Sequence, residues 1–149
     1  MYSQMAAVSL IPNAVIDMVP LNENAKKFAE ILGVELEGVD KSLSREELLD
    51  RMTNNSLNLY VTYSECAPIL PLESFEKNVL CITGNNHHYF KDSELEKYLV
   101  VNNEESPIDI KNKIVNCLKN EDKIKKMYEK FRDDNIKKSK LDVDRFIKM

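Results

Sequence analysis

The chain alternates between short apolar runs and stretches whose apolar residues recur at helical spacing. Apolar runs rich in β-branched residues predict strands, whereas apolar residues three and four positions apart predict helices. We predict strands over 14–21, 34–39, 57–63, 79–83 and 99–101. We predict the end of a helix over 2–10, helices over 22–32, 44–52, 72–78 and 106–118, a helical turn over 93–98 and charged helices over 121–149. Strands that alternate with helices indicate βαβ units and a parallel sheet.

Several of these helices carry boundary signals. Asn22 can cap one helix through its side chain, and Gly33 suits the left-handed position after its end. The segment 44–47 reads Ser-Arg-Glu-Glu, which is the pattern of a capping box. Ser106 and Pro107 fit the N-cap and the first position of a further helix.

Two glutamates frame the loop that follows the strand at 57–63. The chain leaves the strand at Ser64, and Glu65 follows. Pro71 fits the first position of the next helix, so Glu73 would lie in its first turn. The carboxyl ends of strands are where open α/β sheets bind ligands. We therefore interpret both glutamates as candidate binding residues. Alternatively, Glu65 is a solvated loop residue and Glu73 only favours the helix macrodipole.

The two glutamates, with the strand at 79–83 and the helix from Ser106, resemble the donor-binding half of retaining GT-B glycosyltransferases, the group 1 family. The resemblance covers nearly all of the chain and implies one domain over 1–149, a Rossmann-like parallel sheet flanked by helices, with a helical C-terminal tail. It implies that Glu73 holds the ribose of a nucleotide-diphosphate sugar and that Glu65, beside the donor sugar, is the catalytic residue.

Further donor-binding residues are implied by the same resemblance. In the loop and the start of the helix they are Cys66, Ala67, Pro68, Ile69, Leu70 and Leu72, with backbone N–H groups of 69–72 on phosphate. After the strand at 79–83 they are Asn85, Asn86 and His87, which could also simply bond nearby backbone. Adjacent histidines point apart, so we expect no two-histidine metal site at this loop. The implied small molecule is the donor substrate, with no cofactor.

Two parts of the family pattern have no counterpart here. These are the acceptor-binding half and the first strand of the donor half, with the glycine and basic residues that grip the diphosphate. A first strand is central in a doubly wound sheet. We therefore expect the sheet to close up or to be completed by another chain, because unpaired buried backbone groups are costly.

Two hypotheses of function follow. The first is the donor-binding half of a retaining glycosyltransferase, which transfers a sugar from a nucleotide diphosphate to an acceptor hydroxyl in glycan or polysaccharide biosynthesis. This chain alone would be inactive and would need a partner that supplies the acceptor half. The second is a non-catalytic Rossmann-like module for binding or assembly.

Composition restricts the remaining possibilities. The chain has 149 residues, 43% of them hydrophobic and 31% charged, which is ordinary for a soluble domain. The net charge of -4 gives no reason to expect nucleic acid as a partner. No apolar run reaches the length of a membrane span, and three scattered cysteines suit a reducing compartment. We expect a cytoplasmic protein, with oligomerisation and peripheral association with the inner membrane face both left open.

Overall fold

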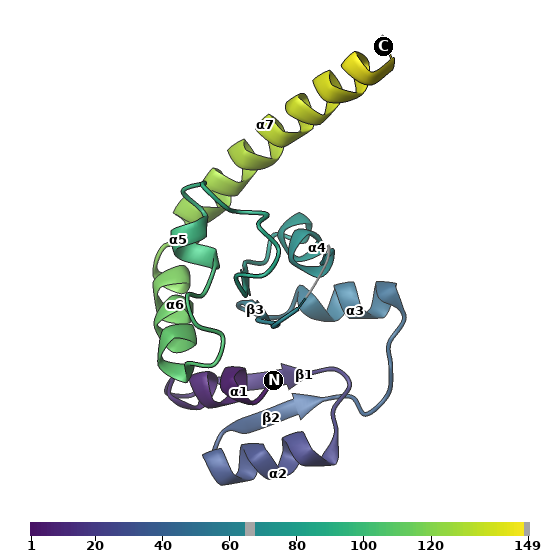
Figure 1. Ribbon diagram of the computed structural model, residues 1–149. Helices are drawn as coiled ribbons and strands as arrows, with labels where there is room; N and C mark the ends of the chain where they lie inside the picture. The colour runs from purple at the N-terminus through teal and green to yellow at the C-terminus, as the bar shows by residue number, and fades with distance from the viewer. Residues whose placement is uncertain (65–67, 148–149) are drawn as a thin grey trace.

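The computed structural model describes residues 1–64 and 68–147 and has a mixed α/β fold (Figure 1). Its elements in chain order are α1 (Tyr2–Ser9), β1 (Val15–Met18), α2 (Glu23–Leu32), β2 (Glu35–Gly38), α3 (Arg45–Met52), β3 (Asn58–Tyr60), α4 (Leu70–Glu76), β4 (Cys81–Thr83), α5 (Glu96–Leu99), α6 (Pro107–Lys119) and α7 (Glu121–Ile147). The α/β class and the helical C-terminal tail are confirmed.

The predicted caps of α2 and α3 are confirmed. The Asn22 side chain accepts a hydrogen bond from the N–H of Ala25, and Gly33 adopts a left-handed conformation with φ of 65°. In the capping box, the N–H of Glu47 donates to the Ser44 hydroxyl at 3.2 Å, and the Ser44 N–H donates to the Glu47 carboxylate at 2.8 Å. These contacts satisfy N–H groups that have no partner within a helix.

The strands form two separate parallel pairs among the described residues. In the first pair, β1 lies beside β2 with Val15 opposite Glu35. In the second pair, β3 lies beside β4 with Asn58 opposite Cys81. The parallel pairing is as expected, but β1 and β3 do not pair, so one continuous sheet is not formed. The expected closing up of the sheet between β1 and β3 has therefore not occurred.

The strands are shorter than the apolar pattern predicted: the run 14–21 contributes only Val15–Met18, the run 34–39 only Glu35–Gly38, and the run 79–83 only Cys81–Thr83. The run 57–63 contributes only β3, which ends at Tyr60. The run 99–101 contributes a single bridge between Val100 and Thr83, because Leu99 still belongs to α5.

The hydrophobic core is divided at the same place as the strands. The larger cluster surrounds β3 and β4 and includes Ala7 of α1. The smaller cluster consists of Met5, Ala25 and Ala29, with partly buried residues of β1, α2 and β2 packed against them. Helix α1 therefore contributes to both clusters.

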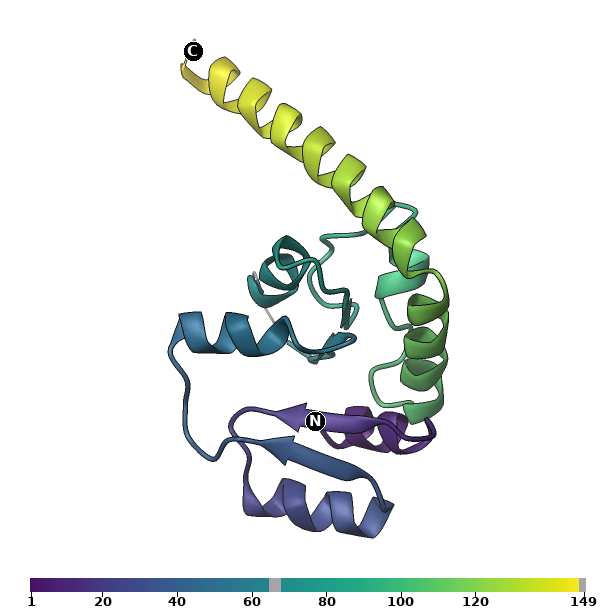
Figure 2. The ribbon, with the colours of Figure 1, turned by 180° about the vertical axis from the view of Figure 1, so that it is seen from behind.

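The last two helices lie along one side of the larger cluster and then leave it. Ile110, Ile114 and Cys117 of α6 are buried, whereas Leu118 is 38% exposed. Ile124 and Tyr128 anchor the start of α7. Figures 1 and 2 both show the rest of α7 projecting from the body. Within the described residues, none of the helices combines the length and apolarity needed to cross a bilayer.

Candidate functional site

The described part of the candidate site consists of the start of α4 and the loops that follow β3 and β4. Glu65, Cys66 and Ala67 lie outside the described residues. The predictions for these three residues therefore stay predictions.

Glu73 lies in the first turn of α4, as expected. The helix begins at Leu70, so Pro71 takes its second position rather than its first. The Glu73 side chain is 19% exposed and forms an ion pair with Arg45, the first residue of α3, whose side chain is 75% exposed. A cation therefore lies beside the candidate ribose-binding carboxylate. Spacing along the chain could not predict this contact, because the two residues come from different helices.

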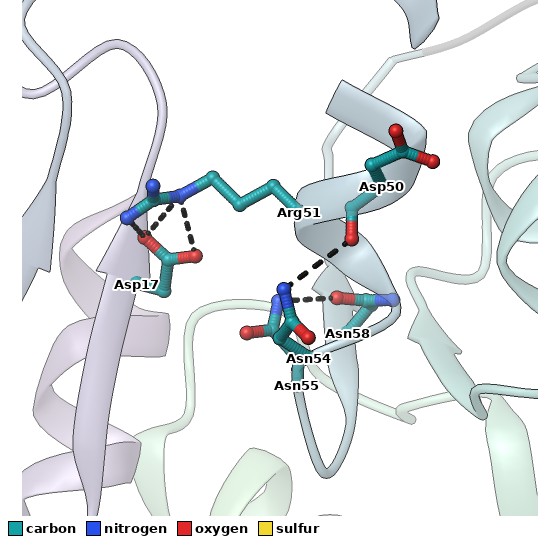
Figure 3. A network of polar contacts seen from close by, with 6 residues as sticks. All are labelled: Asp17, Asp50, Arg51, Asn54, Asn55 and Asn58. Atoms are coloured by element: carbon teal, nitrogen blue, oxygen red, sulfur yellow. Dashed lines mark hydrogen bonds and ion pairs between the residues drawn. The ribbon is translucent and has the colours of Figure 1, made fainter. Parts of the chain in front are cut away.

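A chain of hydrogen bonds, which is partly buried at Asn55 and fully buried at Ser74, fixes α4 against β3. The Asn55 amide donates to the side-chain oxygen of Asn58 at 2.8 Å (Figure 3). The Asn58 amide in turn donates to the hydroxyl of Ser74 at 2.8 Å, and that hydroxyl donates to the carbonyl of Val79 at 2.9 Å. Ser74 is fully buried and directly follows Glu73. The network therefore fixes the turn of α4 that carries the candidate carboxylate.

The loop residues just before α4 offer few groups to a phosphate. Pro68 is buried and Ile69 is 61% exposed, while Leu70 and Leu72 are half-buried. The N–H of Leu72 donates to the carbonyl of Ile69 at 2.9 Å, and Pro71 has no N–H. The N–H groups of Ile69 and Leu70 are thus the remaining ones in the segment that we expected to bind phosphate.

The loops after β3 and β4 are tied together. The Asn86 side-chain amide donates to both oxygens of Thr62, reaching the hydroxyl at 3.0 Å. Gly84 allows this approach, because a Cβ at its position would lie 2.5 Å from the Thr62 carbonyl oxygen. The carboxyl ends of the two strands therefore open at one common edge, where ligands of parallel sheets bind.

The remaining candidates of the second loop differ in exposure. The Asn85 side chain is exposed, and its backbone N–H donates to a Glu104 carboxylate oxygen at 2.6 Å. His87 is buried, accepts from the Tyr89 N–H at 3.3 Å and packs its ring against Tyr89 and Phe90. These contacts suit a residue that holds the loop together. Asn85 is therefore the better placed of the two to meet a ligand.

A depression of about 250 Å³ opens beside Asn85, and it is lined by residues of α5, by Val100 and by the segment after it. Pockets for drug-sized ligands occupy roughly 300–1,000 Å³.

Among the described residues, no hydrogen bond or ion pair joins Glu73 to Asn85 or Asn86. The described residues also contain no cluster of three or more histidine, cysteine, aspartate or glutamate side chains that could hold a metal ion.

A scan of protein-family models found no match to this sequence, and searches of curated proteins and of solved structures found no matching protein. The residues and contacts described above are therefore the basis of the proposed function.

Proposed function

We propose that this protein binds a nucleotide-diphosphate sugar at the carboxyl ends of β3 and β4, as the donor-binding half of a retaining glycosyltransferase. The observation that supports this best is the position of Glu73. It lies in the first turn of the helix that follows a parallel strand, is 19% exposed, and is held in place through the buried neighbour Ser74. A carboxylate in this position can accept hydrogen bonds from both hydroxyls of a ribose.

The arrangement of the strands also supports a Rossmann-like origin. The parallel pairs β1–β2 and β3–β4, with Val100 bridged to β4, follow the order found on the two sides of the central strand in a doubly wound sheet. Ligands of such sheets bind where the strand order reverses. In this protein, that point corresponds to the carboxyl ends of β1 and β3, where the two separate strand pairs lie next to each other in this order.

Arg45 provides a positive charge beside Glu73 that spacing along the chain did not predict. Departure of a nucleoside diphosphate develops negative charge, which a nearby cation stabilises. The Arg45 side chain is 75% exposed and pairs with Glu73, and we propose that it moves from this carboxylate to the diphosphate when a donor binds. Glu65, Cys66, Ala67, Asn85, Asn86 and His87 remain proposed donor contacts. Sugar transfer itself would need an acceptor-binding partner, and the use of a nucleotide donor favours a cytoplasmic location.

Isothermal titration calorimetry with UDP, GDP and their sugars tests the proposal. We expect Glu73→Gln to weaken binding by about 1–3 kcal/mol, the size of a charge-assisted hydrogen bond. Glu76→Gln is the matched control, because it makes the same change on the exposed face of the same helix and should leave affinity unchanged. Equal affinities of the Glu73 variant and the unmodified protein would remove Glu73 from the ribose site.

A non-catalytic module for binding or assembly is the second candidate. The break between the two strand pairs and the occupied N–H of Leu72 favour it, because both reduce what the loop can offer to a donor. The absence of any heat with millimolar UDP, GDP or their sugars would select this candidate over the first.

A further inference from the structure

Strand β3 has a free edge that faces away from β4. Successive peptide groups of a strand point to alternate edges, and the N–H of Asn58 donates to the carbonyl of Leu80 beside β4. The peptide groups of Leu59 and Val61 must therefore point to the other edge. Within the described residues, no strand pairs with β3 on that side, and none pairs with β1 on the side away from β2. Free edges of this kind are templates for pairing with another segment.

A side chain takes the place of a neighbouring strand at Val61. The Gln4 amide of α1 donates to the Val61 carbonyl at 3.0 Å and accepts from the Val61 N–H at 3.3 Å. A primary amide carries one acceptor and two donors on adjacent atoms, so it reproduces the pair of groups that a strand presents. The contact satisfies the backbone N–H and carbonyl of Val61. Among the described residues, however, no strand pairs with the neighbouring peptide groups of this edge.

A second side chain, that of Arg51, reaches β1 from the face opposite α1. Arg51 of α3 donates three hydrogen bonds of 2.6 to 2.9 Å to the carboxylate of Asp17 (Figure 3). Ile16 and Met18 pack with Met5 of α1 in the smaller cluster. Because side chains alternate along a strand, Asp17 points to the face opposite α1. The space between the edges of β1 and β3 thus has an apolar face at α1 and a charged face at the Arg51–Asp17 ion pair.

We propose that an extended segment of another polypeptide adds between β1 and β3 as a further strand, and that its peptide groups replace the Gln4 amide at Val61. Such β-strand addition uses the backbone for affinity and alternate side chains for specificity. The two faces require apolar side chains toward α1 and polar side chains toward the Arg51–Asp17 pair. The apolar side chains would join the two hydrophobic clusters, which are separate in the free protein.

The probe is a fluorescein-labelled synthetic heptapeptide of alternating valine and threonine. We expect it to bind in fluorescence anisotropy and to slow amide hydrogen exchange at Leu59 by about tenfold or more, as measured by NMR. A second peptide with proline at its centre cannot donate to the ladder and should do neither. Gln4→Ala removes the competing amide and should raise the affinity for the valine–threonine peptide by about three- to tenfold, the equivalent of a hydrogen bond.

Ser9→Ala is the matched control, because the Ser9 hydroxyl donates only to the carbonyl of Ala6 within α1 and should not affect affinity. If Gln4→Ala does not fold, Gln4→Glu keeps the acceptor for the Val61 N–H and loses the donor, which gives the same comparison. Slow exchange at Leu59 in the free protein would overturn the proposal. It would also be overturned if the peptide does not bind, or if it protects only amides outside β1 and β3. All of these readouts are independent of nucleotide binding, so they can fail or succeed separately from the proposed function.

Discussion

Ser74 is the residue whose loss tests most directly how the candidate site is held in place. Its buried hydroxyl donates to the Val79 carbonyl at 2.9 Å and accepts from the Asn58 amide at 2.8 Å. Ser74→Ala removes both hydrogen bonds and leaves a buried donor and a buried acceptor without this partner. A typical hydrogen bond contributes about 1 kcal/mol, and an unsatisfied buried group costs about 1–3 kcal/mol. We therefore expect the free energy of unfolding to fall by about 2–3 kcal/mol.

Urea unfolding followed by circular dichroism measures this loss. With an m-value of about 2 kcal/mol per M, the midpoint should fall by about 1–1.5 M. Ser56→Ala is the control, because Ser56 is exposed and its replacement should change stability by less than about 0.5 kcal/mol. If the two variants shift the midpoint equally, the buried network does not stabilise the fold as argued. A double-mutant cycle with Asn58→Ala should also give a coupling energy above about 0.5 kcal/mol.

Two further predictions concern ionisable groups. In a Cys66→Ser background, Cys81 and Cys117 should be inert to a thiol reagent near pH 8 until urea is added. Burial raises the pKa of both thiols, and that of Cys117 rises from 9.0 to about 12, which lowers its thiolate fraction by about a thousandfold. A thiol that reacts rapidly in the native protein would contradict this packing. Hydrogen bonds from Ser44 lower the pKa of Glu47, so its stabilisation is present above about pH 4.5 and is lost as the pH falls through the lower folded-state value. Melting temperatures of the unmodified protein and Glu47→Gln should therefore converge between about pH 5 and pH 3, and a constant difference would refute the role of the capping box.

Local signals in the sequence predicted the helices well. Asn22, Gly33, Ser44 and Ser106 act where their side-chain or backbone chemistry indicated, because a cap is decided by residues a few positions apart. Sheet continuity could not be predicted in the same way. It depends on which strand edges meet, and these edges belong to segments far apart in the chain.

The candidate site shows the same division. The spacing of Pro71 and Glu73 was enough to place the glutamate in the first turn of a helix, since that placement is local. Its partner Arg45 could not be found from spacing, because the contact depends on how α3 packs beside α4. The contact between Asn86 and Thr62 likewise requires the two loops to meet at one edge.

The early end of β3 connects the two proposals. The apolar run continues to Tyr63, yet the strand ends at Tyr60, because the next two residues bond to side-chain amides instead of a strand. Gln4 binds Val61 on one edge, and Asn86 binds Thr62 on the other. An added strand would replace the first of these amides, whereas a donor at the carboxyl edge would lie beside the second. Comparing Gln4→Ala with Glu73→Gln in both binding assays therefore separates the two sites: each variant should affect its own ligand, and a reversed pattern would contradict both assignments.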